Sequence, residues 1–403
     1  MYLNELFNIA DGGSIFSFDL EHGIEKRAFS ESALVPRLGK SVTEHIRTLL
    51  NKSGEYNERI GTHPDFLEMS EGEEVNQYVI SVFVDIQGST NLAFKYDLSK
   101  VRMIKNRILS IAIEIFQGCD GHVHRLQGDA IFGYFGDRAS TISNAVINAL
   151  NACSILQAYI NEHLKIQFEQ EGIEPIKLRV GLDLGYDKDV LWSKYGIRDC
   201  SETTTTSLHT DLAAKLQGKC SANKIMIGQN ILTHLDIPEE FISIKKKQVD
   251  GEIKSDRYIV NRNELRYKMF QFEWEKYIRT FSFVPKNDIF SNIELQCKYG
   301  EDSNNLEDYI ANSKSIKKGI DLKFSILGLD NFEDYDIEWS VINRGIEASN
   351  SESGLEFEVE RYRGVLYCLE TTAYKGHHYM QCTIRHNNII VGRDKFGIYV
   401  NDN

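Results

Sequence analysis

Residues 78–90 read YVISVFVDIQGST. The first seven residues are nearly all β-branched or aromatic, a composition typical of a strand that is covered on both faces. Asp85 ends this run, and a turn containing Gly88 follows. A second stretch, residues 127–136, reads QGDAIFGYFG and again places an aspartate, Asp129, beside a glycine at the border of an apolar strand. Because hard divalent cations prefer oxygen ligands, two carboxylates presented in this way can hold such cations, which in turn can hold a triphosphate.

The pattern around these two stretches predicts a ferredoxin-like α+β domain. Apolar residues recur at spacings of three and four between Val101 and Ile115, which favours a helix with one buried stripe. The glycine beside Asp129 favours a hairpin with that aspartate at its turn. The order strand, helix, strand, strand, helix, strand is typical of the ferredoxin-like fold. These six elements are expected at residues 78–84, 101–115, 122–126, 130–135, 141–166 and 176–184.

The chain is long enough for several domains, because 403 residues exceed the size at which one core usually keeps growing. A C-terminal β-rich domain is expected from short alternating apolar segments separated by turn signals such as Arg344-Gly345. The expected divisions are an N-terminal extension at 1–75, a catalytic domain at 76–260, a connecting region at 261–318 and the β-rich domain at 319–403.

Composition narrows the classes of partner. The chain has 46 Lys and Arg against 59 Asp and Glu, a net charge of −13, so polymeric nucleic acid is not an expected partner. The N-terminus lacks the pattern of a secretion signal, and no run of about 18 apolar residues predicts a membrane span. We therefore expect a soluble, cytoplasmic protein. The seven cysteines are scattered without a C-x-x-C pair, which favours reduced thiols over disulfides or a zinc site.

Four stretches together resemble the sequence blocks of the class III nucleotidyl cyclases, in the order in which that family has them. They are the two aspartate stretches, LRVGLDLG at 178–185 and TDLAAKL at 210–216. The resemblance covers roughly residues 75–235. It implies two divalent cations per site, manganese or magnesium, which are bound by Asp85, Asp129 and the backbone carbonyl of Ile86.

The same resemblance implies roles for four further residues. Phe83 and Arg125 occupy positions of the base pocket, where adenine-specific members tend to have Lys and guanine-specific members Glu in place of Arg125. Asp211 and Lys215 occupy positions where the family usually has Asn and a transition-state Arg. Lys215 keeps the positive charge but lacks the planar fork of Arg, so it can act as a point donor to phosphate.

These departures, together with EWSVINRG at 338–345 and ETTAYKGHH at 370–378, resemble the bacterial pyrimidine cyclases of Pycsar antiphage defence over nearly the whole chain. The resemblance implies conversion of CTP or UTP to cyclic CMP or cyclic UMP plus pyrophosphate, a C-terminal sensor domain, and a separate effector protein that reads the product. Because the family builds each site from two domains, one cyclase domain per chain implies a homodimer with its active sites at the interface.

The sequence is also compatible with two alternative functions. One is an adenylate or guanylate cyclase, against which Arg125 argues. The other is a catalytically silent nucleotide-binding sensor, which the retention of Asp85 and Asp129 disfavours and the unusual Asp211 favours. Structural interpretations also stand beside the functional ones: Phe83 could serve ordinary packing, and Arg125 could pair with a surface carboxylate.

Overall fold

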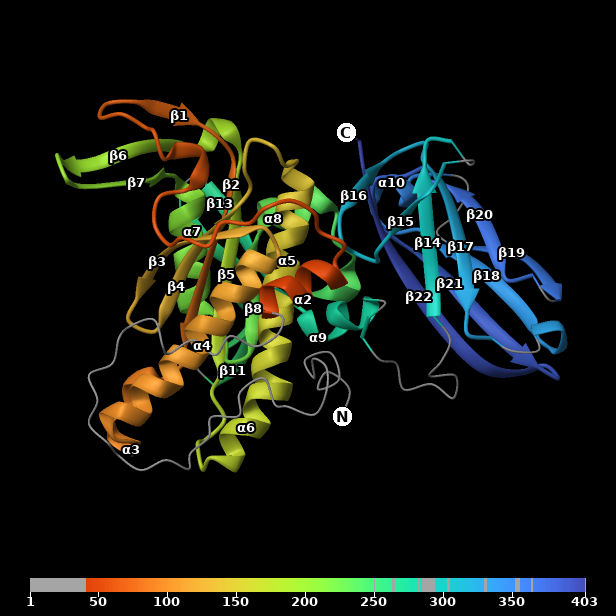
Figure 1. Ribbon diagram of the computed structural model, residues 1–403, viewed down its shortest axis with the longest axis horizontal. Helices are drawn as coiled ribbons and strands as arrows, with labels where there is room; N and C mark the ends of the chain where they lie inside the picture. Colours follow the sequence, from red (N-terminus) through yellow and green to blue (C-terminus); the bar gives the residue numbers. More distant parts are fainter. Residues whose placement is uncertain are drawn as a thin grey trace.

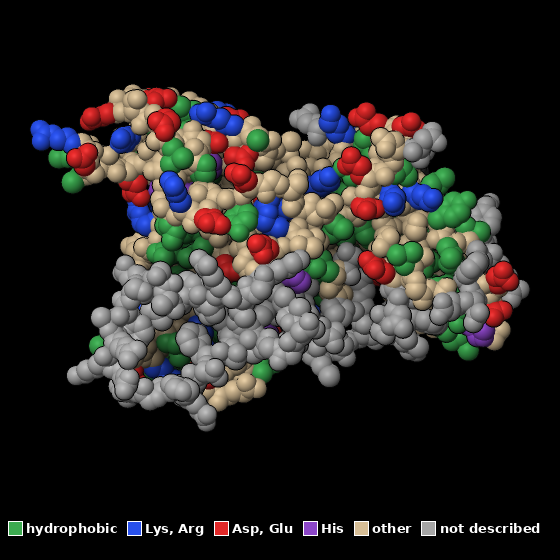
Figure 2. All heavy atoms as spheres, viewed as in Figure 1, with side chains coloured by type: hydrophobic (Ala, Val, Ile, Leu, Met, Phe, Trp, Pro, Cys, Tyr) green, Lys and Arg blue, Asp and Glu red, His purple; other side chains and the backbone are tan. Residues whose placement is uncertain are grey.

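The computed structural model describes residues 41–402 except 250, 263–264, 282, 285–293, 303–304, 330–331, 352–355 and 364. These residues form two packed units, an α+β unit followed by a β-sandwich (Figure 1). The first 40 residues of the predicted N-terminal extension lie outside this range. Within the described residues, none of the helices combines the length and the apolar composition that a bilayer crossing demands. Figure 2 shows acidic and basic side chains intermixed over the described part of the viewed surface.

The first unit is built on one sheet with the strand order β12-β13-β8-β5-β2-β4-β3, and β9 pairs with β13 beside this path. Strand β2 runs antiparallel to both of its neighbours, β5 and β4. The predicted hairpin, β3 and β4, closes one edge. The bounds are β2 Val79–Ile86, β3 Gly121–Gln127, β4 Ala130–Phe135, β5 Leu178–Gly185, β8 Lys224–Gly228, β9 Ile242–Ser243, β12 Tyr258–Arg262 and β13 Leu265–Phe272.

Helices lie on both faces of this sheet (Figure 1). Side chains on one face of β2, such as Val84, are buried in a core that α4 and α5 share. On the other face, the Ser81 hydroxyl lies 2.9 Å from the Thr210 hydroxyl of α7. The helices are α4 Leu98–Gly118, α5 Ile142–Ala158, which continues through a π-helical turn at Tyr159–Leu164 into α6 Lys165–Gln170, α7 Leu208–Lys219 and α8 Gln229–Leu235.

α7 packs unusually close to the sheet. A Cβ atom at Gly181 of β5 would lie 2.1 Å from the backbone nitrogen of Gln217 and 2.5 Å from the carbonyl oxygen of Ala213. Contacts that short with backbone atoms do not occur, so only glycine at position 181 lets the helix backbone rest directly on the strand. This glycine therefore fixes the position of α7 over β5 and β2.

A three-stranded sheet, β1-β6-β7, stands beside the central sheet. It packs through Trp192, whose ring stacks on Phe66 and contacts Tyr134 of β4. The sheet thereby places strand β7 near β3. Its strands are β1 Glu74–Asn76, β6 Leu191–Ile197 and β7 Cys200–Thr206.

The second unit is a β-sandwich with its own hydrophobic core. One sheet has the order β15-β14-β17-β20 and the other β16-β22-β21-β18-β19. The strands are β14 Glu294–Gly300, β15 Glu307–Tyr309, β16 Ser315–Lys317, β17 Asp321–Leu327, β18 Asp336–Ile342, β19 Glu356–Arg363, β20 Tyr367–Thr371, β21 Gly376–His386 and β22 Ile389–Asn401.

The segment 261–318, predicted as a connecting region, contributes strands to both units. β13 hydrogen-bonds to β8 in the first sheet, while β14, β15 and β16 belong to the sandwich. The aromatic residues early in this segment include Tyr267 and Phe272, which are buried. Their apolar surface is what brings β13 onto the sheet edge.

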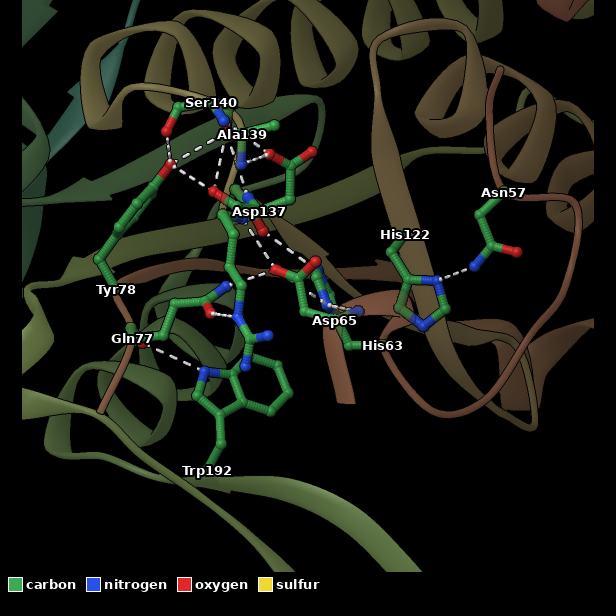
Figure 3. Close-up of polar contacts among 12 residues, drawn as sticks. Asn57, His63, Asp65, Gln77, Tyr78, His122, Asp137, Ala139, Ser140 and Trp192 are labelled. Carbon is green, nitrogen blue, oxygen red and sulfur yellow. Dashed lines mark hydrogen bonds and ion pairs between the residues drawn. The ribbon is translucent and has the colours of Figure 1, made fainter. Parts of the chain in front are cut away.

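The described part of the N-terminal segment packs onto the first unit. Figure 3 shows Asp65, Gln77, Tyr78 and Ser140 in one polar network with Trp192. The Asp65 carboxylate accepts a hydrogen bond of 2.7 Å from the Gln77 side chain, and the Tyr78 hydroxyl donates one of 2.6 Å to the Ser140 carbonyl. Trp192 donates its indole N–H to the Gln77 carbonyl at 3.1 Å. These bonds join residues before β2 to the turn after β4.

His122 of β3 is held neutral by the same segment. Asn57 donates its amide N–H to His122 Nδ1 at 2.8 Å, and His122 Nε2 lies 2.7 Å from the Gly61 carbonyl, to which it donates. Only a neutral ring with its proton on Nε2 satisfies both partners. Burial lowers the pKa of His122 to about 4, and burial likewise lowers the pKa of His234 to about 4.

Acidification should therefore destabilise the protein. The unfolded chain takes up a proton at this imidazole near pH 6.5, whereas the folded chain does so only near pH 4. Since the unfolded state binds more protons between these values, the free energy of unfolding falls as the pH falls through this window. At about 1.4 kcal/mol per pKa unit, His122 alone accounts for a loss of up to roughly 3 kcal/mol. Urea titrations at several pH values measure it.

The control is a second histidine. His122→Gln should make the pH dependence of stability shallower, with His234 accounting for part of what remains. His386→Gln, at an exposed ring, should leave the dependence as in the parent. An unchanged slope in the His122 variant would contradict the assignment.

Candidate active site

The two predicted carboxylates lie at the same end of neighbouring strands. Register pairs Val84 of β2 with Ile131 of β4, so Asp85 at the end of β2 and Asp129 just before β4 follow the last paired position. Neighbouring strands are about 4.8 Å apart, which brings the two backbones close. Gly128 has a φ of 67° and Asp129 does not have a positive φ, as in a two-residue type II′ turn. Glycine in this turn thus presents Asp129 at the hairpin tip.

The Asp85 carboxylate faces two side chains that the sequence did not single out. Arg179, its register partner on β5, forms an ion pair with Asp85 Oδ2. Gln217 of α7 donates an amide N–H to the same oxygen at 3.2 Å. Only 20% of the Asp85 side chain is exposed. Both partners use one carboxylate oxygen, and they tie Asp85 to the strand and the helix that flank it.

The Asp129 carboxylate has one oxygen with a partner and one without. Lys105 Nζ of α4 lies 3.4 Å from Oδ1. Among the described residues, Oδ2 is buried and has no hydrogen-bond partner. A buried anionic oxygen without a partner is costly, and a cation removes that cost. The donor set of two carboxylates at one sheet end fits a hard divalent cation, with further oxygen ligands from the backbone and a substrate.

A surface of aromatic side chains lies on the face of the sheet that α7 covers. Phe83 of β2 stacks on Phe132 of β4, with ring centroids 4.2 Å apart and an angle of 8° between the rings. Phe83 is half-buried, so it serves packing and still borders solvent. His124 of β3 contacts Phe132 edge-on at 5.2 Å.

Arg125, predicted for the base pocket, pairs with Glu202 of β7. Its Nε donates to Glu202 Oε1 at 3.0 Å, and its terminal nitrogen contacts the other carboxylate oxygen. Both side chains remain nearly half exposed. His124 Nε2 also lies 3.0 Å from Glu202 Oε1. Strands β3 and β7 therefore present a guanidinium and a carboxylate together.

α7 carries Asp211 and Lys215 on an exposed face. Among the described residues, neither side chain makes a hydrogen bond or ion pair. The start of the helix is anchored instead by a buried carboxylate, Asp183 of β5. His209 Nδ1 donates to Asp183 Oδ2 at 2.9 Å, and the Tyr267 hydroxyl donates to Oδ1 at 2.8 Å. Burial raises the pKa of Asp183 and opposes its charge, which the two donors offset.

The sequence predicted candidate site residues but not the side chains that contact them. Arg179, Gln217 and Lys105 contact the aspartates, and Glu202 contacts Arg125. The signal for Arg179 is its place opposite Asp85 in adjacent strands of the predicted sheet. Gln217 and Glu202 carry no comparable signal, because packing of α7 and of the β6–β7 hairpin decides their positions.

One family model and two named relatives match large parts of this chain. A family model described as the adenylyl/guanylyl and SMODS C-terminal sensor domain matches residues 272–401. A protein of Staphylococcus aureus named cytidylate cyclase is 45% identical over 374 residues, which are 90% of this chain and 88% of that protein. An Escherichia coli protein of the same name is 33% identical over 97% of this chain and 90% of its own length.

Among solved structures, the adenylyl cyclase CyaB from P. aeruginosa matches 50% of this chain and 95% of its own, with 19% sequence identity and a TM-score of 0.42.

The anchor of α7 can be tested by stability. Asp183→Leu should lower the free energy of unfolding by about 3 kcal/mol or more, because it leaves His209 and the Tyr267 hydroxyl buried without their acceptor. Asp183→Asn, which keeps an acceptor oxygen, should cost about 1 kcal/mol. Denaturant titrations at pH 7 measure both. Equal losses in the two variants would show that the hydrogen bonds do not carry the effect.

Proposed function

Because the chain belongs to the Pycsar-like class III nucleotidyl cyclases, we propose that it converts CTP into cyclic CMP and pyrophosphate. Relatives named cytidylate cyclase support CTP over UTP. The structural observation that carries the proposal is the pair of carboxylates, Asp85 and Asp129, at one end of neighbouring strands, with a buried Asp129 oxygen that no described side chain satisfies.

The reaction displaces pyrophosphate within one molecule. The ribose 3′ oxygen forms a bond to the α-phosphorus, the bond from that phosphorus to the bridging oxygen breaks, and the hydroxyl proton leaves to solvent. When bound, divalent ions, manganese or magnesium, supply charge neutralisation at the attacking and the leaving oxygens. Asp85, Asp129 and the Ile86 carbonyl would hold them. Lys105 is placed beside Asp129, where its ammonium group also favours a bound polyphosphate.

The backbone after the first aspartate offers few free amides. The amides of residues 87–90 could cradle phosphate, but the Gln87 N–H donates to the Lys177 carbonyl at 2.8 Å. Phosphate contacts therefore rest on side chains and on the remaining amides of the turn.

The base pocket is proposed around Phe83 and Arg125, with Glu202 added. Cytosine offers an exocyclic N4 donor next to acceptors at N3 and O2. A carboxylate and a guanidinium held side by side can accept from the first and donate to the second. In the absence of substrate the two groups satisfy each other.

A homodimer with composite sites is proposed from α7. Asp211 and Lys215 are exposed and make no side-chain bond in the described part of the chain, so they are free to act on a nucleotide held by a partner subunit. The Lys215 ammonium would stabilise charge on the transferring phosphate. We further propose cytoplasmic action in antiphage defence, with a separate effector that reads the product. On this proposal the catalytic domain extends through β13, which ends at Phe272, and the β-rich sensor domain begins with β14 at Glu294.

A product assay decides among the candidate functions. Purified protein is incubated with each of the four ribonucleoside triphosphates and manganese, and products are identified by mass. We expect cyclic CMP as the main product. Cyclic AMP or cyclic GMP alone would establish a purine cyclase, and no product from any substrate would favour the silent sensor.

Loss of either carboxylate should abolish turnover. Asp85→Ala and Asp129→Ala should each lower the rate by about a thousandfold or more, because charge neutralisation in the transition state is lost. The exposed Asp308 gives the control, since Asp308→Ala should retain full activity. Circular dichroism verifies folding. Parent-like turnover in either site variant would refute the metal assignment.

Mixing two inactive variants tests the composite site. An Asp85→Ala subunit supplies an intact Lys215, and a Lys215→Ala subunit supplies an intact Asp85. In an equal mixture half of the dimers are mixed, and each of these has one intact site, so about one quarter of parental activity should return. No recovery after subunit exchange would show that both residues act within one chain.

A further inference from the structure

A cavity of about 290 Å³ lies between the two sheets of the C-terminal sandwich. This space is partly open to solvent and has room for roughly ten water molecules, so a small molecule can enter it. Its wall is largely apolar and includes Leu322, Phe324, Val341, Met380, Ile398 and Val400.

Two polar side chains on the wall lack hydrogen-bond partners among the described residues. They are Asn343, which follows β18, and Glu370 of β20. Asn343 is 9% exposed, and burial raises the pKa of Glu370. Neither residue has a polar atom that is both fully buried and unpaired, so water can reach these atoms. A ligand with hydrogen-bond donors can replace that water and pair with the carboxylate.

The other polar side chains of the wall are already engaged. His378 Nδ1 accepts from the Arg344 N–H at 3.2 Å, and its Nε2 lies 2.7 Å from the Tyr374 carbonyl, to which it donates. The Thr372 hydroxyl donates to the Lys317 carbonyl at 2.8 Å. The free hydrogen-bonding capacity of the cavity is therefore concentrated at Asn343 and Glu370, which together accept more than they donate.

The cavity wall continues into the contact with the catalytic unit. Asn343 leads through Gly345, with a φ of 102°, to α10 (Ile346–Ser349). The Ile346 N–H donates to Asp236, which ends α8 of the catalytic unit. A Cβ atom at Gly345 would lie 2.6 Å from Asp236 Oδ2, so this contact depends on glycine. Asn343 is thus only three positions along the chain from Ile346, so a ligand at Asn343 would bind close to the contact between the two units.

We propose that this cavity binds a small organic amine with an apolar body of about ten non-hydrogen atoms, whose ammonium group is received by Glu370 and Asn343. The apolar body fits among the side chains of the two sheets. Binding of the amine is separate from the cyclase activity, because it can be measured without a nucleotide.

The test uses the full chain and a simple probe, 2-phenylethylamine. The protein is labelled with ¹³C at its methionine methyl groups, of which the chain has 6, and Met380→Leu assigns the signal of the cavity methionine. We expect a saturable shift of the Met380 signal. Phenylacetate, with the same ring but a carboxylate, should not shift it. No shift with the amine, or an equal shift with both probes, would overturn the proposal.

Variants give the second arm. Glu370→Gln should weaken binding of the amine by about tenfold or more, and Asn343→Leu should weaken it independently. The exposed Glu294→Gln should bind as the parent does. The remaining methionine signals verify that each variant is folded. Unchanged affinity in folded Glu370→Gln would refute the role of the carboxylate.

Discussion

The close packing of α7 on the central sheet is the constraint on which the rest of the site depends. The absence of a side chain at Gly181 lets the helix backbone rest on β5, and this brings Gln217 within 3.2 Å of Asp85. The same placement turns Asp211 and Lys215 outward. A larger residue at position 181 would push α7 away from the sheet. This shift would break the contact between Gln217 and Asp85 and would also displace Asp211 and Lys215.

Charge at the site is balanced differently for the two carboxylates. Asp85 already has a cationic partner, Arg179, whereas Asp129 has Lys105 at longer range and one buried oxygen with nothing to satisfy it. A bound cation would therefore replace Arg179 as the positively charged partner of Asp85. At Asp129 it would give the buried oxygen a partner that this oxygen now lacks. The two aspartates are thus positioned by contacts from three other elements, β5, α7 and α4, as well as by the strand and the turn that carry them.

The sandwich domain is connected to the catalytic unit through the wall of its cavity. Its two sheets share a core of their own, yet the wall of its cavity runs without interruption into the Asp236 contact with the catalytic unit. The sandwich and the catalytic unit are thus joined by a hydrogen bond from the Ile346 backbone to the Asp236 carboxylate, and Gly345 lies beside this contact. Asn343 of the cavity wall lies three residues before Ile346, which makes that contact.

The sequence by itself determined the order of the elements and the local setting of each aspartate. Apolar runs, helical spacing and a Gly-Asp turn are local signals, so they predicted the order of strands and helices, the hairpin that carries Asp129, and the cyclase resemblance. Tertiary structure alone decided the partners. Arg179, Gln217 and Glu202 come from elements far apart in the chain, and strand 265–272 joined the first sheet although its sequence reads as a connection. Side-chain pairing across elements depends on packing distances, which no local pattern contains.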